Sequence, residues 1–320
     1  MAKTLLFLAL AYVHGFLYSQ DYPARPVRMI VGFPPGGGTD VVARIIAPGL
    51  AELLGQAVVI ENRPGATGTV AAGLVAKSPA DGYTLMMGHV SVNAIAPSLF
   101  ANLPYDVNTD FAPIGIAAAV PHFVVVHPSL SARSLKELIS LLKARRDPLT
   151  FPSAGNGSMP HLAGEMFKAL AGVDLLHVPY KGTGQSMQDL LGGQHVVAFD
   201  TMPASAPHVR SGRLVALSVS SASRLPAFPD VPTAEEAGLP GYLVTTWYGV
   251  FAPAGTPFAV VKRLHAELVK AMRSSDTHAK LEGIGADGTV SRSPEEFAAL
   301  VRADTARYAK IVKDIGLRID

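Results

Sequence analysis

The feature that most constrains the fold is a repeated alternation of short β-rich runs and helical segments, which begins near Pro23. Apolar, β-branched runs at 27–33, 57–63 and 83–88 each lead into a loop and then into a segment with helical periodicity. Further strands are expected at 122–127, 149–155, 174–180, 195–200 and 213–220. This alternation predicts an α/β fold whose sheets are mostly parallel and flanked by helices.

Chain length sets the number of lobes. At 320 residues the chain exceeds what one hydrophobic core usually serves, so we expect two lobes. No linker is long and polar enough to separate independent domains, and the chain is expected to cross between the lobes near 124–127 and 245–249. This assigns residues 21–123 plus 247–320 to lobe I and residues 124–246 to lobe II, with a ligand cleft between them.

Composition excludes several classes of function. The chain has 27 Lys and Arg against 25 Asp and Glu, a formal net charge of +2, and no basic run, so nothing favours a nucleic-acid partner. It has no cysteine, which excludes thiolate zinc sites, disulfides and a cysteine nucleophile. Its ten histidines show no metal-like spacing. We therefore expect neither a metal nor a cofactor.

The first twenty residues have the order of a secretory signal peptide. Lys3 precedes an apolar stretch from Leu5 to Leu17, and small and polar residues follow near Ser19. The alternatives are a membrane anchor or a buried helix, but about thirteen apolar residues fall short of the ~20 that span a bilayer. We expect residues 1–20 to direct export to the periplasm.

A proline–glycine loop, "GFPPGGGTD", follows the first expected strand. Gly36, Gly37 and Gly38 allow the backbone to approach a ligand closely, and Thr39 or Asp40 can cap the helix that follows. Free N–H groups at such a helix start, together with the positive end of the helix dipole, favour an anion. A tight turn with no ligand is the structural alternative.

Two kinds of nucleotide-binding loop can be compared with this one. A Walker A loop needs a lysine after its last glycine, where Gly38 stands here. A dinucleotide fingerprint needs G-x-G-x-x-G; Gly36 and Gly38 fit, but Val41 stands at the third glycine. Glu61, at the end of the second strand, is the acid that such a fold would use. A dinucleotide-dependent enzyme therefore stays open as the alternative function.

Three further loops of small residues lead into helices, at 62–70, 152–165 and 179–186. If the strands of both lobes point their carboxyl ends at one cleft, the helix N-termini that follow these loops converge there, as in other open α/β sheets. Such a cleft can hold an anion with backbone N–H groups and needs few cationic side chains.

Beyond these patterns, the sequence resembles a known family over nearly the whole mature chain. The ordered motifs are "YPARPVRMIVGFPPGGGTDVVAR", "LGQAVVIENRPGATG", "SPADGYTL", "LPYDVNTDFAPIG", "HVPYKGTG", "LPAFPDVPTAEEAGLPGY" and "WYGVFAPAGTP". They are similar to those of the extracytoplasmic solute receptors of tripartite tricarboxylate transporters, the Bug family. The resemblance implies a monomeric, two-lobed periplasmic binding protein of type II-like architecture. It also implies hinge closure on a small carboxylated solute and delivery to permease subunits or a sensor protein.

The resemblance further implies a set of ligand-binding residues in which backbone N–H groups hold a ligand carboxylate. Carried onto this sequence, the set comprises Gly36, Gly37, Gly38, Thr39, Ala66, Thr67, Gly68, Ser153, Gly157, Ser158, His161, Lys181, Gly182 and Asp200, with ligand-specific contacts expected at Phe33, His89 and Ser91. Structural alternatives stay open for some of them. His161 can cap or pack, Lys181 can be a solvated loop residue, and Asp200 can make a structural hydrogen bond or bind an ammonium, a hydroxyl or a water.

No motif supports catalysis. The chain has no H-E-x-x-H and no G-x-S-x-G sequence. Ser158 and His161 are three residues apart, as a nucleophile and its base could be, but no local motif gives the pair catalytic geometry. The sequence therefore predicts a solute receptor rather than an enzyme.

Overall fold

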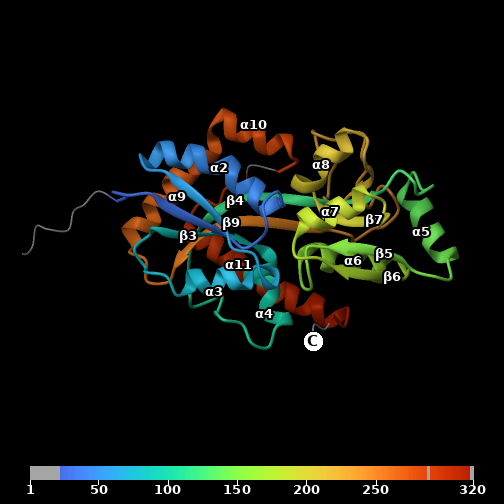
Figure 1. The fold of residues 1–320 in the computed structure, drawn as a ribbon, viewed down its shortest axis with the longest axis horizontal. Helices are drawn as coiled ribbons and strands as arrows, with labels where there is room; N and C mark the ends of the chain where they lie inside the picture. The colour runs from blue at the N-terminus through green and yellow to red at the C-terminus, as the bar shows by residue number, and fades with distance from the viewer. Residues whose placement is uncertain (1–21, 287–288, 318–320) are drawn as a thin grey trace, which may run out of the picture.

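The computed structural model describes residues 22–286 and 289–317, so the expected signal peptide lies outside the described residues. The protein is elongated, with two α/β lobes side by side (Figure 1). The first lobe holds the N-terminal and C-terminal elements, drawn in blue and in orange to red, and the second lobe holds the middle of the chain, drawn in green and yellow. The predicted two-lobed α/β architecture is confirmed.

Five strands form the sheet of the first lobe, in the order β2, β1, β3, β9, β4. Strands β1 (Val27–Val31), β2 (Val58–Asn62) and β3 (Thr84–His89) are parallel to one another, as the sequence predicted. Strand β9 (Thr245–Pro253) instead runs antiparallel to both β3 and β4. The sheet is therefore mixed through β9 alone, since β4 runs in the same direction as β1, β2 and β3. The reversal of β9 was not predicted, because strands buried on both faces give the same apolar pattern in either direction.

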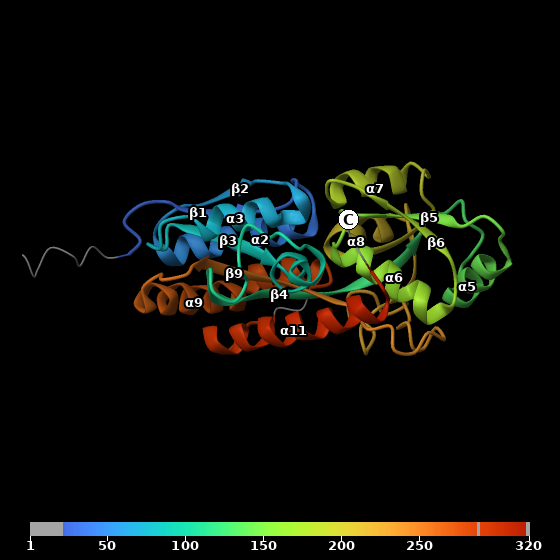
Figure 2. The same cartoon turned by 90° about the horizontal axis from the view of Figure 1, so that it is seen from below.

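Helices cover both faces of this sheet. On one face, α2 (Gly38–Leu54), α9 (Phe258–Arg273) and α10 (Ser275–Gly283) pack against alternate residues of β1, such as Met29. The other face is covered by α3 (Thr69–Ala76), α4 (Ala96–Leu99), α11 (Pro294–Asp314), the 3-10 turn η1 (Ala66–Gly68) and the π-helical turn η2 (Ser91–Ile95). Figure 2 shows α11 running beneath the first lobe toward the second.

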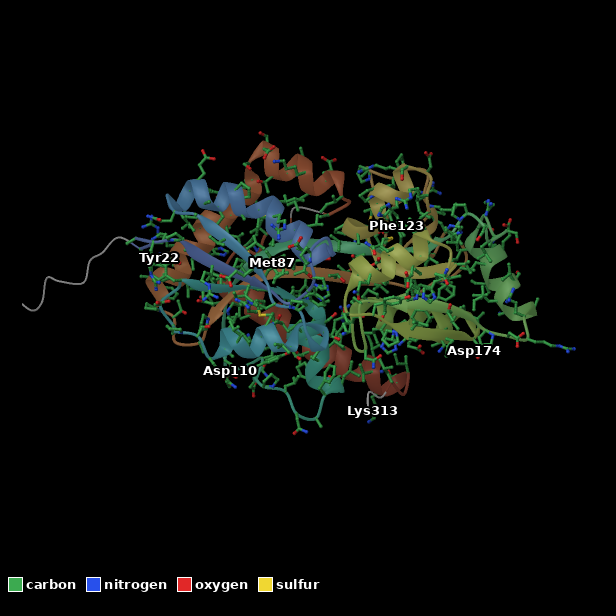
Figure 3. All side chains as sticks on the ribbon, in the orientation of Figure 1. Tyr22, Met87, Asp110, Phe123, Asp174 and Lys313 are labelled. Atoms are coloured by element: carbon green, nitrogen blue, oxygen red, sulfur yellow. The ribbon has the colours of Figure 1, made fainter. Side chains whose placement is uncertain are left out.

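The longest strand, β4 (Phe111–Val126), belongs to both lobes. Its residues 111–121 pair with β9, whereas residues 122–126 pair with β7 (Val197–Thr201) and β8 (Val215–Val219). The sequence predicted only its second half as a strand, because Pro121 interrupts the apolar run. Pro121 lies opposite Thr245, at the last pair with β9. Figure 3 shows Met87 in the first lobe and Phe123 beyond this point, in the second.

The second lobe is built on the end of β4. Strands β7 and β8 pair antiparallel with it, and β5 (Leu149–Ser153) and β6 (Leu175–Pro179) form a separate parallel pair. The helices of this lobe are α5 (Leu135–Ala144), α6 (Met159–Ala171), α7 (Thr183–Leu191) and α8 (Met202–Arg210). At the start of α5, Ser134 Oγ accepts a hydrogen bond from Glu137 N–H at 3.2 Å, as a capping residue does.

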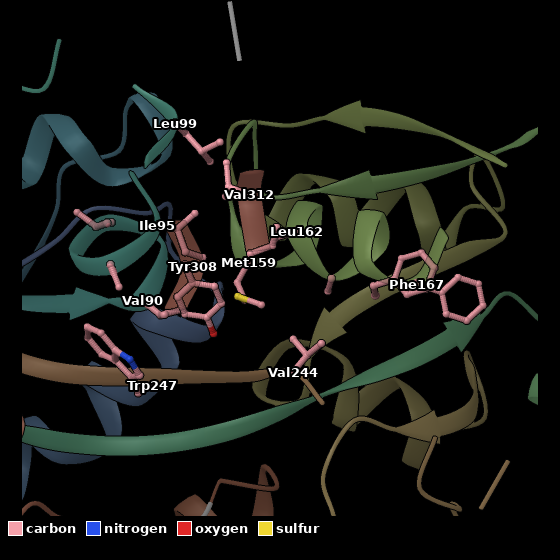
Figure 4. Close-up of a cluster of buried hydrophobic side chains, with 14 of the residues drawn as sticks. Val90, Ile95, Leu99, Met159, Leu162, Phe167, Val244, Trp247, Tyr308 and Val312 are labelled. Carbon is pink, nitrogen blue, oxygen red and sulfur yellow. The ribbon is translucent and has the colours of Figure 1, made fainter. Parts of the chain in front are cut away.

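An apolar core continues from one lobe into the other around α11. Figure 4 shows Val312 of α11 beside Leu162 and Met159 of α6, in the same cluster as Trp247 of β9. Trp247 Nε1 donates to Asp304 Oδ2 at 2.7 Å, which fixes the tryptophan at the junction of the lobes. Among the described helices, none combines the length and the apolar character that crossing a membrane requires.

Candidate functional site

A narrow cavity lies where the two lobes meet, and we call it the inner cavity. Its volume is about 20 Å³, which gives room for one water-sized group. The first lobe contributes the β1–α2 loop and the ends of β3 and β9, and the second lobe contributes the starts of α6, α7 and α8. The lining residues are Phe33, Gly37, Gly38, Thr39, His89, Ala154, Ser158, Pro160, Thr183, Thr201 and Tyr248.

Four helices begin at the wall of the inner cavity. Their N-caps are Gly37 for α2, Ser158 for α6, Gly182 for α7 and Thr201 for α8. Of these four caps, Ser158 alone bonds to its own helix with the side chain, accepting from His161 N–H at 3.4 Å. The N–H groups of a first helical turn have no intrahelical partner, and the helix dipole adds partial positive charge. In α6, however, residue 160 is a proline and the N–H groups of Met159 and His161 bond to serine hydroxyls, so the free donors that converge on the inner cavity come from α2, α7 and α8.

Asp40 shapes the first glycine loop. Gly36 N–H donates to Asp40 Oδ2 at 3.0 Å, and Asn62 and Arg44 donate to the same carboxylate at 2.8 and 2.9 Å. Burial opposes ionisation of Asp40, but the hydrogen bonds, led by that from Arg44, hold its pKa below the ordinary value. The N–H of Gly36 is thus used within the loop, and Gly36 lines a separate hollow of about 490 Å³ beside α7.

A row of three aromatic rings borders the inner cavity. The His89 ring lies between Phe33 and Tyr248, with centroids 5.3 and 5.2 Å apart. His89 Nδ1 accepts from Ser91 N–H at 3.0 Å, which places the proton of the neutral ring on Nε2. Burial lowers the pKa of His89 to about 3, so the ring is uncharged at neutral pH. His89 can supply a donor but no positive charge.

Two buried hydroxyls of the inner cavity have no hydrogen-bond partner among the described residues. They are the Tyr248 hydroxyl and Thr201 Oγ1, on residues that are 0% and 3% exposed. Both adjoin Gly38, since a Cβ atom built on Gly38 would collide with the first and lie 3.0 Å from the second. An unpaired buried hydroxyl costs about 1–3 kcal/mol, so an acceptor that enters the cavity is favoured by pairing them.

A larger groove, the outer groove, adjoins the inner cavity and measures about 710 Å³. Phe33 and Ala154 line both spaces. The other lining residues are Gly32, Pro34, Pro64, Gly65, Ala66, Thr67, Gly68, Phe100, Gly155, Asn156, Pro179, Tyr180, Lys181 and Gln185. The second predicted loop, which precedes α3, therefore lines the outer groove and not the inner cavity. The start of α8, which was not predicted as part of the site, lines the inner cavity.

The loop at 65–68 is strained where it borders the outer groove. All four residues have positive φ, including the non-glycine residues Ala66 (43°) and Thr67 (55°). Thr67 Oγ1 donates to the carbonyl oxygen of Asn156 in the second lobe at 2.8 Å. A strained segment thus links the two lobes beside the groove.

Three predicted residues of the third loop shape that loop and lie outside the walls of the inner cavity and the outer groove. Gly157 N–H donates to His161 Nδ1 at 3.1 Å, and the His161 ring stacks on His177 with centroids 3.6 Å apart. His177 Nε2 lies 2.6 Å from Ser153 Oγ. Burial lowers the pKa of His161 to about 4 and that of His177 to about 3, so the stacked rings are uncharged at neutral pH.

Two other predicted residues make contacts between the lobes. Ser91 Oγ accepts from Met159 N–H at 2.8 Å. Gly182 lies so close to Pro34 that a Cβ atom would clash with the proline ring. Together with the Thr67 hydrogen bond, these contacts show the lobes closed on one another.

Asp200 is buried at the end of β7, beside the inner cavity. It lies among Ser153, Ala154 and Pro160, in a space that leaves no room for a further group. Its Oδ1 accepts from Thr201 N–H at 2.7 Å. Burial raises the pKa of its carboxyl to about 7.

Tyr248 and Thr201 were not predicted as site residues. Tyr248 belongs to the segment at 245–249 where the chain was expected to cross between the lobes, and Thr201 directly follows the expected strand that ends at Asp200. A polar residue within or just after a buried apolar strand is a signal that could have indicated them. Their lack of partners, however, becomes visible only in the folded chain.

The acid required by the dinucleotide alternative reaches neither cavity. Glu61 pairs with Arg28 at 2.6 Å and with Arg63 at 3.3 Å, and the hydrogen bonds from Arg28 lower its pKa to about 2. It is absent from the walls of the inner cavity and the outer groove. The structural role assigned to Glu61 in that alternative is therefore wrong. Within residues 22–286 and 289–317, no group of three or more His, Asp or Glu is arranged to hold a metal.

Comparison with known proteins agrees with this geometry. The model of the tripartite tricarboxylate transporter family receptor matches residues 42–317. The chain is also similar to Protein BugT of Bordetella pertussis, with 38% identity over 317 residues that cover 98% of this chain and 96% of that protein.

Solved structures are similar over nearly their whole length. The periplasmic binding protein BugD aligns with a TM-score of 0.88 at 36% identity, covering 93% of this chain and 99% of its own. R. palustris Rpa4515 with adipate gives 0.90 at 38% identity, covering 93% and 99%. MatC from Rhodopseudomonas palustris with bound malate gives 0.86 at 37% identity, covering 91% and 100%. The fold is that of a periplasmic binding protein, and the class is a solute receptor rather than an enzyme. The family match and the identity to BugT show that the chain belongs to the receptor family of the tripartite tricarboxylate transporters.

Proposed function

We propose that this receptor captures a small organic anion by holding one oxygen of its carboxylate in the inner cavity. The observation that carries the proposal is the convergence of the N-termini of α2, α7 and α8 and two unpaired hydroxyls on one cavity. Helix N–H groups and hydroxyls stabilise an anion by directed hydrogen bonds. The residues that line the inner cavity include no Lys and no Arg, so backbone donors replace a buried cation.

The rest of the bound solute extends from the inner cavity into the outer groove, between Phe33 and Ala154. The inner cavity admits one water-sized group, whereas the groove measures about 710 Å³. In the groove, the predicted residues Ala66, Thr67, Gly68 and Lys181 are placed to contact the solute. The adipate and malate bound to related proteins are dicarboxylates, which supports a carboxylate ligand here.

Entry of the solute requires the lobes to open about a hinge. We place the hinge where β4 and β9 pass between the lobes, so that residues 21–123 and 247–320 move as one body and residues 124–246 as the other. His122 marks this point: its N–H donates to Ser220 Oγ at 2.8 Å, and its Nε2 lies 2.8 Å from Thr246 Oγ1. Domain closure concentrates the backbone rotation in a few such residues where elements pass between the moving bodies.

The expected leader at residues 1–20 and the family together support a periplasmic receptor. We propose that it acts as a monomer and delivers its solute to the permease subunits of a tripartite tricarboxylate transporter or to a sensor protein. Neither a cofactor nor a nucleic acid has a place in this function.

Calorimetric titration of the mature chain with malate, adipate, citrate and glutamate tests the proposal. We expect at least one of these anions to bind and to raise the melting temperature, because a ligand at 100 times its Kd stabilises the folded state by about 2.7 kcal/mol. Adipamide, which has the shape of adipate without its charges, is the matched control and should not bind. Binding of NAD⁺ with no binding of the four anions would overturn the proposal.

A further inference from the structure

Asp200 places an acidic side chain beside a cavity that favours anions. The residue is 6% exposed and lies at the end of β7. Its neighbours Ala154 and Pro160 also line the inner cavity, as does the next residue in the chain, Thr201. A carboxylate bound in the inner cavity would therefore lie close to the Asp200 carboxyl, in surroundings from which water is largely excluded.

No positive charge compensates Asp200. Its carboxyl accepts a hydrogen bond from Thr201 N–H, and its side chain forms no ion pair among the described residues. The helices α6, α7 and α8 carry Glu165, Lys168, Asp189, His208 and Arg210, and none of these bonds to Asp200. The other titratable groups on the surrounding elements are Tyr248 of β9, His122 of β4, His161 of α6 and His177 of β6. None of these four carries a charge at neutral pH, because burial keeps each of them in its neutral form.

Two carboxylates that share a dry site cannot both remain ionised at low cost. When two such groups lie close together, one of them keeps a proton, as in the aspartic proteases. Here the bound solute is favoured in its ionised form, because helix N-termini and two hydroxyls donate to it. The proton must then remain on the protein side, where Asp200 has no cation to stabilise its charge.

Resting on the proposed function, we propose that the receptor takes up one proton when it binds a carboxylate, and that Asp200 carries this proton. The bound anion then faces a neutral carboxylic acid. Asp200 Oδ1 keeps its bond from Thr201 N–H, and the protonated oxygen can donate to the solute. The affinity of the receptor falls as the pH rises, since each binding event needs a proton from solution.

The pKa values of the surrounding groups allow the titration of Asp200 to be distinguished from theirs. Burial raises the pKa of Asp200 to about 7, whereas those of His89, His122 and His161 are lowered to between about 3 and about 4. Malate and adipate ionise well below about pH 6, as ordinary carboxylic acids do. Between about pH 7 and about pH 9, Asp200 is therefore the group of the inner cavity and its walls that responds.

The test is calorimetric titration with malate and with adipate, in HEPES and in Tris, from about pH 6 to about pH 9. For the wild-type protein we expect Kd to rise about tenfold per pH unit above about pH 7, as uptake of one proton requires. The binding heat should differ between the two buffers by the ionisation heat of one proton. Asp200→Asn, which keeps the acceptor for Thr201 N–H, should show a flat pH profile and a buffer-independent heat.

Asp304→Asn is the matched control. Asp304 is a buried aspartate of α11 that accepts from Trp247 Nε1, and it lies outside both cavities. This variant should keep the tenfold slope and the buffer dependence. Binding of malate or adipate with no proton uptake between about pH 8 and about pH 9, or an Asp200→Asn variant that keeps the wild-type slope, would overturn this inference and leave the receptor function standing. Failure of all four carboxylates of the panel to bind would instead refute the proposed function, and this inference with it.

Discussion

Gly38→Ala is the sharpest test of the inner cavity. A Cβ atom at this position would collide with the Tyr248 hydroxyl and lie 3.0 Å from Thr201 Oγ1. The first contact is within the first lobe, between α2 and β9, and the second crosses to the start of α8 in the second lobe. The substitution should therefore both strain the first lobe and hinder closure.

The size of each effect can be worked from these contacts. Overpacking in a buried site costs about 1–3 kcal/mol, and each kcal/mol lowers the melting temperature by roughly 2–4 °C in a protein of about this size. We expect Gly38→Ala to melt roughly 2–12 °C below the wild type. Alanine in place of a helical glycine would otherwise stabilise by up to about 1 kcal/mol, so a lower melting temperature identifies the clash. Affinity should fall about tenfold or more, which corresponds to 1.4 kcal/mol.

Scanning calorimetry measures the melting temperature, and calorimetric titration with malate and adipate measures the affinity. Two further variants are measured beside Gly38→Ala. Gly49→Ala is the control on the same helix: its Cβ atom would lie 3.5 Å from its nearest neighbours, an ordinary contact, and it should match the wild type in affinity. In the double variant Gly38→Ala/Tyr248→Phe the colliding hydroxyl is absent: within the first lobe the nearest remaining ring atom, Cζ, lies at 3.4 Å, while the 3.0 Å contact with Thr201 Oγ1 across the lobes persists. Its melting temperature should recover, but its affinity should not.

The outcomes separate the two parts of the reasoning. If Gly38→Ala equals Gly49→Ala in melting temperature and affinity, the inner cavity is not where the anion binds. If the double variant recovers its affinity together with its stability, the Tyr248 hydroxyl does not contact the anion, and the clash alone explains the single variant.

Three further predictions follow from the same structure. Tyr248→Phe removes an unpaired hydroxyl, so the ligand-free protein should melt at the same or a higher temperature while its affinity for malate or adipate falls. Tyr242→Phe is the control: it removes a hydroxyl that donates to Ala163 O, so this variant should melt at a lower temperature and bind normally. Thr67→Ala loses the hydrogen bond to Asn156 O, worth about 0.5–1.5 kcal/mol, and should weaken anion binding about two- to tenfold, mainly through a faster off-rate in stopped-flow measurements. Because burial raises the pKa of Asp200 to about 7, the wild type should lose stability relative to Asp200→Asn as the pH rises from about 4 to about 7. Urea unfolding should show a loss of up to about 4 kcal/mol in the free energy of unfolding. A difference between the two proteins that does not depend on pH would contradict the raised pKa.

Local patterns were sufficient to predict much of the fold. The strand at 27–31, the glycine loop after it and the helix from Gly38 all follow from periodicity and loop chemistry. Strand direction could not be predicted, since the apolar run of β9 would read the same in a parallel strand. The full length of β4 was hidden as well, because Pro121 breaks the apolar pattern at the place where the strand changes lobes.

The candidate site was predictable at the level of loops and less so at the level of atoms. Glycine loops before helices mark positions where N–H groups are free, and Gly37, Gly38 and Ser158 do line the inner cavity. The neutral state of Asp200 and the unpaired hydroxyl of Tyr248 depend on what other segments bring near them, and one sequence does not contain those distances. Such features depend on contacts between segments that are distant in the sequence.

Anion binding and closure are coupled because the donors belong to different lobes. The α2 terminus comes from the first lobe and the α7 and α8 termini from the second, so an anion meets both sets only when the lobes are closed. A ligand shifts such an equilibrium by the difference in its affinity for the two states. The closed arrangement gains hydrogen bonds between the lobes at Thr67 and Ser91, each worth about 0.5–1.5 kcal/mol. It also carries positive φ at Ala66 and Thr67 and two unpaired hydroxyls, each of which costs about 1–3 kcal/mol. These costs offset the gain from the two hydrogen bonds, so these contacts alone do not favour closure without an anion. An anion that pairs the hydroxyls shifts the equilibrium between open and closed lobes toward the closed state. When the anion leaves, the equilibrium shifts back, as a receptor that must release its solute requires.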